Sequence, residues 1–441
     1  MLKRKALDML SVWKGKRDRK PLIVEGARQV GKTFAVRAFA SDAYATTYEL
    51  NFLERPALKQ VFEGNLSAND VLAGIRLSFP ENRYEAGRTL IFLDEIQACP
   101  QALTALKFLG GDSRFDVIAS GSALGMLHGQ VSSWPVGQVE YLHMYSLDFE
   151  EFLWAAGVDE AIIETVRGYR NGEKHIPEAI HRAMMRYLRQ YLVIGGMPDV
   201  VKVFFPEYDY VAADEVQRRI YSDYVADIAH YAEPETRLKA QKCWRSVPLQ
   251  LAKENHKFQY ATVEHRGTTR KFGSAVDWLL AAEMVGRVLN VTKVEYPLRA
   301  FEMEDHFRLY PMDIGLLIST YDFGLKRALV SEEGVNQTES IVLKTAKGGI
   351  YEALAAEMLW KRGRKGLHFY RNTTGTVEIE FLLEGEEGVI PVEVKAGNNK
   401  TRSLNTILES VEIARGYKFA DQNAGIDGKK ITLPLYMLMF F

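Results

Sequence analysis

Two glycines, a lysine and a threonine near the start of the chain have the spacing of a phosphate-binding loop. An apolar run at 21–24 precedes them and an apolar-periodic segment follows, which is the strand, loop and helix order that such a loop requires. Backbone N–H groups of a curled glycine-rich loop can point at phosphate oxygens, and the helix N-terminus adds positive dipole. The segment predicted to hold ATP is Gly26, Ala27, Arg28, Gln29, Val30, Gly31, Lys32 and Thr33. In this reading Lys32 bridges the β- and γ-phosphates, and the Thr33 hydroxyl is offered to Mg²⁺, which prefers oxygen ligands.

A second segment, LIFLDEIQ, supplies carboxylates for the same chemistry. Its apolar run predicts a buried parallel strand that ends at Asp94 and Glu95. Ligands of open α/β sheets bind at the carboxyl ends of the strands. We therefore expect Asp94 to hold Mg²⁺ and Glu95 to polarise the attacking water, although an acidic pair at a helix N-terminus is the alternative. Ser120 ends the next apolar run and is predicted to touch the γ-phosphate or the water, with a turn of small residues as the alternative.

Acidic residues and a lysine near the C-terminus form a further pattern. Alternation of apolar residues at 377–383 predicts a strand with Glu380 on its polar face, and Glu393 and Lys395 share a face of the next strand. This pattern resembles the metal site of restriction-endonuclease-like enzymes, in which Glu352 would be an added helix acid. That family usually has aspartate where this chain has Glu380, so we expect no cleavage. A hairpin with a solvated charged face is the alternative reading.

The middle of the chain combines helical periodicity with positive charge. Helices are predicted within 215–255 and 272–284, followed by a valine-rich strand. The order resembles a winged helix-turn-helix, which implies contact with DNA, whereas a helical packing module with a basic surface is the alternative. The basic residues concerned are Lys239, Lys242, Arg245, Lys253, Lys257, Arg266, Arg270 and Lys271.

Composition limits the remaining classes. A chain of 441 residues with 47% hydrophobic and 26% charged residues is expected to contain several globular domains. Its formal net charge is −1, so the whole chain does not attract nucleic acid, although basic residues cluster in the first twenty positions. Cys99 and Cys243 cannot form a metal-binding spacing, so no structural zinc is expected. The sequence shows no membrane segment and no signal peptide, and we expect a cytoplasmic protein.

Several motifs together resemble one family: GARQVGKT, LIFLDEIQ, VIASGS, PVGQVEYLHMYSLDFEEFL and YLVIGGMPDVV. They are similar to the AAA+-related ATPases of bacteria and archaea that end in a domain of unknown function with a nuclease-like core. The resemblance implies that the turn at 195–198 closes a helical lid near the nucleotide. The residues themselves indicate only a sharp helix stop.

These observations predict an α/β protein in three parts. An AAA+-type P-loop domain with its lid is expected at 1–205, a winged-helix-like helical domain at 206–330, and a small restriction-endonuclease-like α/β domain at 331–441. The expected function is ATP binding and hydrolysis that acts on DNA or is regulated by it. A nucleotide-dependent protein-interaction switch is the alternative, with a partner protein in place of DNA.

No motif identifies an arginine finger, the residue that would complete phosphoryl transfer and could come from a second copy in an oligomer. The candidates are Arg28, Arg114, Arg182, Arg186 and Arg189.

Overall fold

The computed structural model describes residues 2–122, 134–331, 341–396, 402–410 and 412–441, and the side chains of 341–345 and 410 are not included. The chain divides into two compact units. The first comprises Lys3–Ser146 with Ala281–Glu283, and the second comprises Leu147–Leu280 and Met284–Phe441. In the described part of the chain, no helix has the length and apolar character needed to cross a membrane.

The first unit is built on a five-stranded sheet in the order β2-β3-β4-β1-β5. All of its strand pairs are parallel. The strands are β1 (Leu22–Glu25), β2 (Thr46–Asn51), β3 (Thr89–Asp94), β4 (Asp116–Gly121) and β5 (Glu140–His143). The helical elements are α1 (Lys5–Lys14), α2 (Lys32–Ala43), η1 (Pro56–Phe62), α3 (Ala68–Ser78), η2 (Ile96–Ala98) and α4 (Pro100–Leu109).

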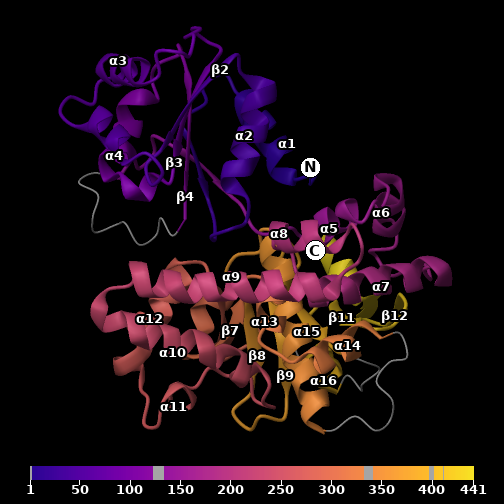
Figure 1. Ribbon diagram of the computed structural model, residues 1–441. Coiled ribbons are helices and arrows are strands. Elements are labelled where there is room, and N and C mark those ends of the chain that lie inside the picture. The colour runs from indigo at the N-terminus through magenta and orange to yellow at the C-terminus, as the bar shows by residue number, and fades with distance from the viewer. Residues whose placement is uncertain (1, 123–133, 332–340, 397–401, 411) are drawn as a thin grey trace. The chain divides into compact units, whose positions relative to one another are not determined.

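Helices cover both faces of this sheet, with α1 and α2 on one side and α3 and α4 on the other (Figure 1). Leu22 and Val24 of β1 join the core cluster that contains apolar residues of α1 and α2. Ile23, between them, joins the cluster on the opposite face. The central strands β1, β3 and β4 are buried along almost their whole length, so their sequences are mainly apolar runs rather than alternating ones. The predicted parallel α/β core is therefore confirmed.

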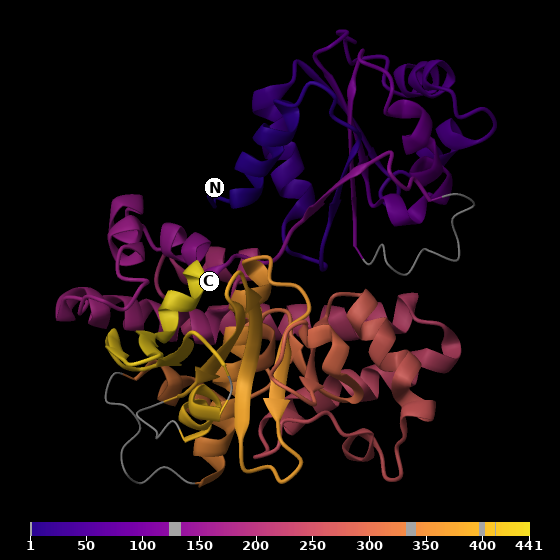
Figure 2. The same ribbon diagram turned by 180° about the vertical axis from the view of Figure 1, so that it is seen from behind.

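The second unit contains an eight-stranded mixed sheet in the order β12-β13-β11-β10-β9-β8-β6-β7. The strands are β6 (Val285–Val291), β7 (Glu302–Pro311), β8 (His368–Arg371), β9 (Glu378–Gly385), β10 (Gly388–Val394), β11 (Gly416–Ala420), β12 (Gly425–Asp427) and β13 (Lys430–Pro434). Figure 2 shows β9 and its neighbours from behind.

The second unit also contains helices, which lie before, between and after its strands in the sequence. Those before the sheet are α5 (Phe149–Ala155), α6 (Glu160–Arg167), α7 (Glu178–Ile194), α8 (Pro198–Phe204), α9 (Tyr210–Tyr231), α10 (Pro234–Leu251), α11 (Tyr260–Val263) and α12 (Thr269–Ala281). Those within or after it are η4 (Leu298–Phe301), α13 (Ile314–Ile318), α14 (Phe323–Val330), α15 (Ile341–Lys361), α16 (Arg402–Ser410) and η5 (Leu435–Phe440).

The two units differ from the three predicted domains. Residues 147–205, predicted to be part of the ATPase domain with its lid, belong to the second unit because they pack within it: the Leu147 N–H donates to the Gly196 carbonyl at 2.7 Å. The boundary predicted at 330 falls inside one sheet, since β6 pairs with β8 in parallel. Long-range strand pairing of this kind leaves no local mark in the sequence.

The turn at 195–198 requires glycine for steric reasons. Gly195 has a φ of 72°, and a Cβ at Gly196 would lie 2.0 Å from the Leu147 carbonyl oxygen. The Gly196 N–H donates to the Asp313 carboxylate at 2.9 Å. This turn is therefore fixed by contacts within the second unit.

Candidate nucleotide-binding site

The predicted phosphate-binding loop connects β1 to α2 in the first unit, and its backbone needs its glycines. Gly26 has a φ of 145° and Gly31, at the N-cap of α2, has a φ of 93°. A Cβ at Gly26 would lie 2.0 Å from the Met144 carbonyl oxygen. Gln29 also has a positive φ, of 62°. The loop is thus tightly curled before the N-terminus of α2, where the helix dipole favours an anion.

Lys32 lies over this loop. Its Nζ donates to the carbonyls of Gly26 at 2.9 Å and Ala27 at 2.7 Å. Burial lowers the pKa of Lys32 to about 8, although the nearby Glu95 carboxylate acts in the opposite direction. Lys32 is therefore a cation at neutral pH, held where the loop would receive phosphate.

Asp94 is the centre of a polar cluster at the carboxyl end of the sheet. The Thr33 hydroxyl donates to both of its carboxylate oxygens, at 3.0 and 3.2 Å. The Asn51 amide donates at 2.9 Å, and the Ser120 hydroxyl also donates to this carboxylate. Asp94 is only 1% exposed, and its three donors compensate the burial of its charge.

Strand register explains why these side chains meet. Asn51 and Asp94 are direct partners in the parallel pairing of β2 with β3. β4 continues the same level on the other side of β3, with Leu93 opposite Ala119 immediately before Ser120. Three neighbouring strands therefore present polar side chains at one edge, as expected for a ligand site in an open α/β sheet.

Glu95 directly follows β3 in a left-handed backbone conformation, with a φ of 53°. The Gln97 amide donates to the Glu95 carboxylate and lies 3.4 Å from the Ser122 hydroxyl. A non-glycine residue in this conformation is strained, and such strain is often found at functional sites.

A buried arginine outside the predicted motif supports the loop. Arg4 donates from Nη1 to the Val30 carbonyl at 2.9 Å and from Nη2 to the Tyr145 carbonyl at 2.7 Å. Its guanidinium thus joins the phosphate-binding loop to the segment after β5, the same segment that approaches Gly26. From the sequence, Arg4 is only one of the basic residues that cluster in the first twenty positions, because an arginine next to other cations carries no local sign of burial.

The oxygen atoms around Asp94 fit a magnesium ion chemically. Mg²⁺ is usually held by one or two carboxylates, substrate phosphates and water. Thr33 and Asp94 are already in hydrogen-bond contact and could share such an ion.

Asn51 was not predicted from the sequence. The argument that selected Ser120 applies to it equally, because each is a polar residue at the end of a neighbouring parallel strand.

The predicted C-terminal site is only partly assembled. Lys395 Nζ lies 2.7 Å from Glu380 and 3.4 Å from Glu393, so both carboxylates face the same cation. Glu352 on α15 is bound instead by His256 at 2.9 Å, Arg308 at 3.0 Å and the Tyr310 hydroxyl at 2.9 Å. Within the described residues, no group of three or more His, Cys, Asp or Glu side chains is placed to hold a metal ion.

The pKa values of Glu380 and Glu352 are shifted in opposite directions. Burial raises the pKa of Glu380 to about 7, although Lys395 opposes the shift. Burial also disfavours the charge of Glu352, but His256 and Arg308 lower its pKa to about 2. Glu352 is thus a charged carboxylate that is compensated by neighbouring side chains, and it is not available as a metal ligand.

The strict alternation predicted for 377–383 is wrong, because the pairing of β8 with β9 is irregular between His368 and Tyr370. Ile379 and Leu382, three residues apart, join the same core cluster as apolar residues of α16. Phe381 contacts Tyr310 instead, with ring centroids 6.3 Å apart.

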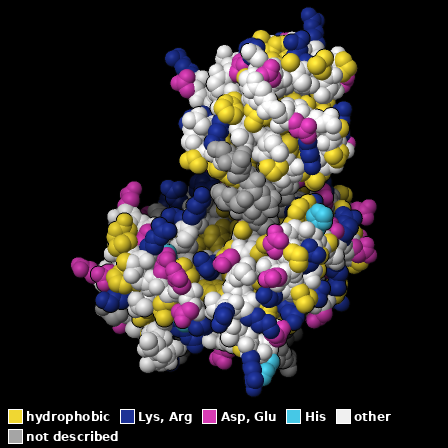
Figure 3. All heavy atoms as spheres, turned by 90° about the vertical axis from the view of Figure 1, so that its left-hand side faces the viewer, with side chains coloured by type: hydrophobic (Ala, Val, Ile, Leu, Met, Phe, Trp, Pro, Cys, Tyr) yellow, Lys and Arg dark blue, Asp and Glu magenta, His cyan; other side chains and the backbone are white. Residues whose placement is uncertain are grey.

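In the middle segment α10, α11 and α12 are followed by the antiparallel pair β6 and β7, and β6 also pairs with β8 of the large sheet. Part of its positive charge is compensated, since Lys242 and Lys271 both pair with Glu264. Arg266 and Arg270 are exposed. Figure 3, seen from the side of α12 in Figure 1, shows Lys and Arg interspersed with Asp and Glu.

Comparison with known proteins agrees with the fold and loop of the first unit, which define a P-loop ATPase. Residues 18–153 match the family model described as "AAA domain". Residues 185–327 and 347–438 match two models described as "Domain of unknown function", DUF8612 and DUF4143. Residues 18–153 therefore have an AAA-type, ATPase-like fold, and the two segments that follow match domains of unknown function. No curated protein sequence matches it.

Solved structures with similar folds are distant. The Walker-type ATPase PABY2304 of Pyrococcus abyssi has 12% identity and a TM-score of 0.44, covering 73% of this chain and 95% of that one. The Aeropyrum pernix ORC1 protein in complex with DNA has 11% identity and a TM-score of 0.29, covering 72% and 90%. Cdc6p from Pyrobaculum aerophilum has 12% identity and a TM-score of 0.27, covering 75% and 94%. Similarities this low carry no argument about activity.

Proposed function

We propose that the first unit binds ATP with Mg²⁺ and hydrolyses it. The observation that carries the proposal is the cluster at one sheet edge, where Lys32 covers the loop and Thr33, Asn51 and Ser120 meet at Asp94. These are the group types that phosphoryl transfer requires: a loop for phosphates, a cation, and oxygen ligands.

In the proposed reaction, the loop N–H groups and Lys32 hold the β- and γ-phosphates. Thr33 and Asp94 would hold Mg²⁺, which neutralises charge that develops on the phosphate oxygens. Glu95 accepts a proton from water as the water oxygen bonds to the γ-phosphorus, and the bond from that phosphorus to the bridging oxygen breaks. The products are ADP and inorganic phosphate. Glu95, at the end of β3, is the carboxylate assigned to this step.

The test separates binding from hydrolysis. Lys32→Ala should weaken ATP binding in isothermal titration, because a buried cation is removed, while the circular dichroism spectrum stays the same. Glu95→Gln should retain ATP but stop turnover, since only the proton acceptor is removed. Unchanged ATP affinity in folded Lys32→Ala protein, or steady turnover by Glu95→Gln, would contradict the proposal.

We propose further that DNA regulates this turnover through the middle segment. The element order of α10 to β7 supports this role, as do two exposed cations that could contact phosphates: Arg270 on α12 and Arg266 in the connection before it. The mixed charge on that side of the molecule (Figure 3) favours instead the alternative, a nucleotide-dependent switch that binds a partner protein.

Stimulation of turnover by duplex DNA distinguishes the two functions. We expect DNA to raise the ATPase rate and a charge-removing Arg266→Gln/Arg270→Gln variant to lose this response. Arg362→Gln/Lys365→Gln is the matched control, since it removes two exposed cations that lie outside the middle segment. A rate that is independent of DNA would leave the protein-binding switch as the supported function.

A further inference from the structure

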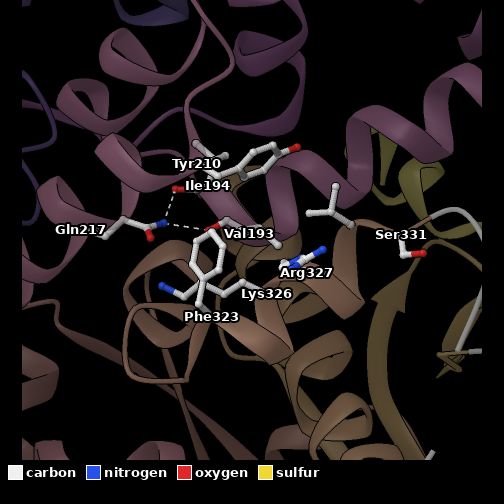
Figure 4. A pocket seen from close by; sticks show the side chains of 9 residues that line it. Val193, Ile194, Tyr210, Gln217, Phe323, Lys326, Arg327 and Ser331 are labelled. Atoms are coloured by element: carbon white, nitrogen blue, oxygen red, sulfur yellow. Dashed lines mark hydrogen bonds between the residues drawn. The ribbon is translucent and has the colours of Figure 1, made fainter. Parts of the chain in front are cut away.

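A pocket of about 410 Å³ lies among α7, α9 and α14 of the second unit (Figure 4). Its wall is mainly apolar: Val193 and Ile194 end α7, and Phe323 and Val330 lie on α14. Tyr210, at the start of α9, adds an aromatic ring. This volume and lining are typical of sites that bind small molecules.

Two polar side chains in the wall are already satisfied by the protein. The Gln217 amide donates to the carbonyls of Val193 and Ile194, at 2.8 Å each, and thereby caps the end of α7 (Figure 4). Lys326 is only 3% exposed and pairs with Asp214. Neither group requires a ligand, so the body of a bound molecule would meet an essentially apolar surface.

Arg327 differs from these groups. Its side chain lines the pocket, is exposed, and makes no hydrogen bond or ion pair with another residue that the structure describes. In Figure 4 its guanidinium points away from the Lys326 amine. The described lining contains no Asp or Glu. One uncompensated cation beside an apolar wall is complementary to a molecule with an apolar body and a single negative charge.

We propose that this pocket binds a small amphipathic carboxylate, with its apolar part among Ile194, Phe323 and Val330 and its carboxylate on Arg327. An Arg–carboxylate pair can form two parallel hydrogen bonds, which gives both orientation and selectivity. The proposal concerns a site in the second unit and is independent of ATP hydrolysis.

The test uses decanoate and the uncharged decanol as matched probes for the full chain, measured by isothermal titration. Decanoate should bind about tenfold more tightly than decanol, which is the preference expected from one charge-assisted pair. Arg327→Gln should abolish this preference and leave decanol affinity unchanged. Arg245→Gln, which removes an exposed cation from α10, should behave as the wild type.

A second variant tests the location. Val330→Trp should fill the pocket and weaken both probes at least tenfold. Because this variant could fold poorly, Phe323→Trp provides an independent measurement at a half-exposed position of the wall. Bromodecanoate should quench the fluorescence of the new tryptophan, and excess decanoate should reverse the quenching. Equal affinities for the two probes, binding unaffected by Arg327→Gln, or the absence of quenching would overturn the proposal.

Discussion

Gly26→Ala is the most direct test of the loop geometry. The new Cβ would lie 2.0 Å from the Met144 carbonyl oxygen, and the residue would have to keep a φ of 145°. A non-glycine residue in such a backbone region costs about 1–3 kcal/mol. Forcing an atom into a filled space adds about 1–3 kcal/mol. The free energy of unfolding of the first unit should therefore fall by about 2–6 kcal/mol.

Gly87→Ala is the matched control in the same unit. Gly87 also has a positive φ, of 74°, but a Cβ there would have no atom within 4 Å. The control should lose only the backbone part, about 1–2 kcal/mol. In a unit of this size, 1 kcal/mol corresponds to a Tm change of about 2–5 °C.

Differential scanning calorimetry of both variants measures the difference, and titration with ATP measures the loop itself. We expect Gly26→Ala to unfold at a clearly lower temperature than Gly87→Ala and to bind ATP more weakly. Equal Tm losses in the two variants would show that the segment after β5 does not press on the loop as the structure has it, and the steric argument would fail.

Four further outcomes follow from the site geometry. ATP affinity should be greatest below pH 8 and fall about tenfold per pH unit above it, because Lys32, whose pKa is lowered to about 8, loses its charge there. Titrations over pH 6–10 measure this dependence. The Lys32→Met variant should bind ATP weakly at every pH. Arg4→Lys should weaken ATP binding several-fold, since one ammonium cannot reproduce both guanidinium bonds, and unchanged affinity would exclude a positioning role. Asn51→Ala should cost about 1–3 kcal/mol in urea unfolding and slow turnover, because the buried Asp94 loses a donor. Plasmid DNA incubated with Mn²⁺ should stay intact; cleavage that Lys395→Ala abolishes would show an active C-terminal site.

The sequence determined those features that depend on residues close together in the chain. The glycines, Lys32 and Thr33 lie within eight residues, so their strand, loop and helix setting can be recognised from spacing alone. The apolar run before Asp94 likewise identifies a strand buried on both faces, because burial acts on every residue of such a strand. The short connection at 384–388 predicts the antiparallel pairing of β9 with β10, which the structure shows.

Only the tertiary structure decided which distant residues meet. Asn51 and Arg4 lie far in sequence from Asp94 and Tyr145, and strand register and helix packing bring them together. The division at residue 146 and the pairing of β6 with β8 also rest on long-range contacts. Sequence periodicity reports the faces of one element and contains no record of its partners. For the same reason Glu352, the right type of residue on the expected helix, is bound to Arg308 rather than free to hold a metal.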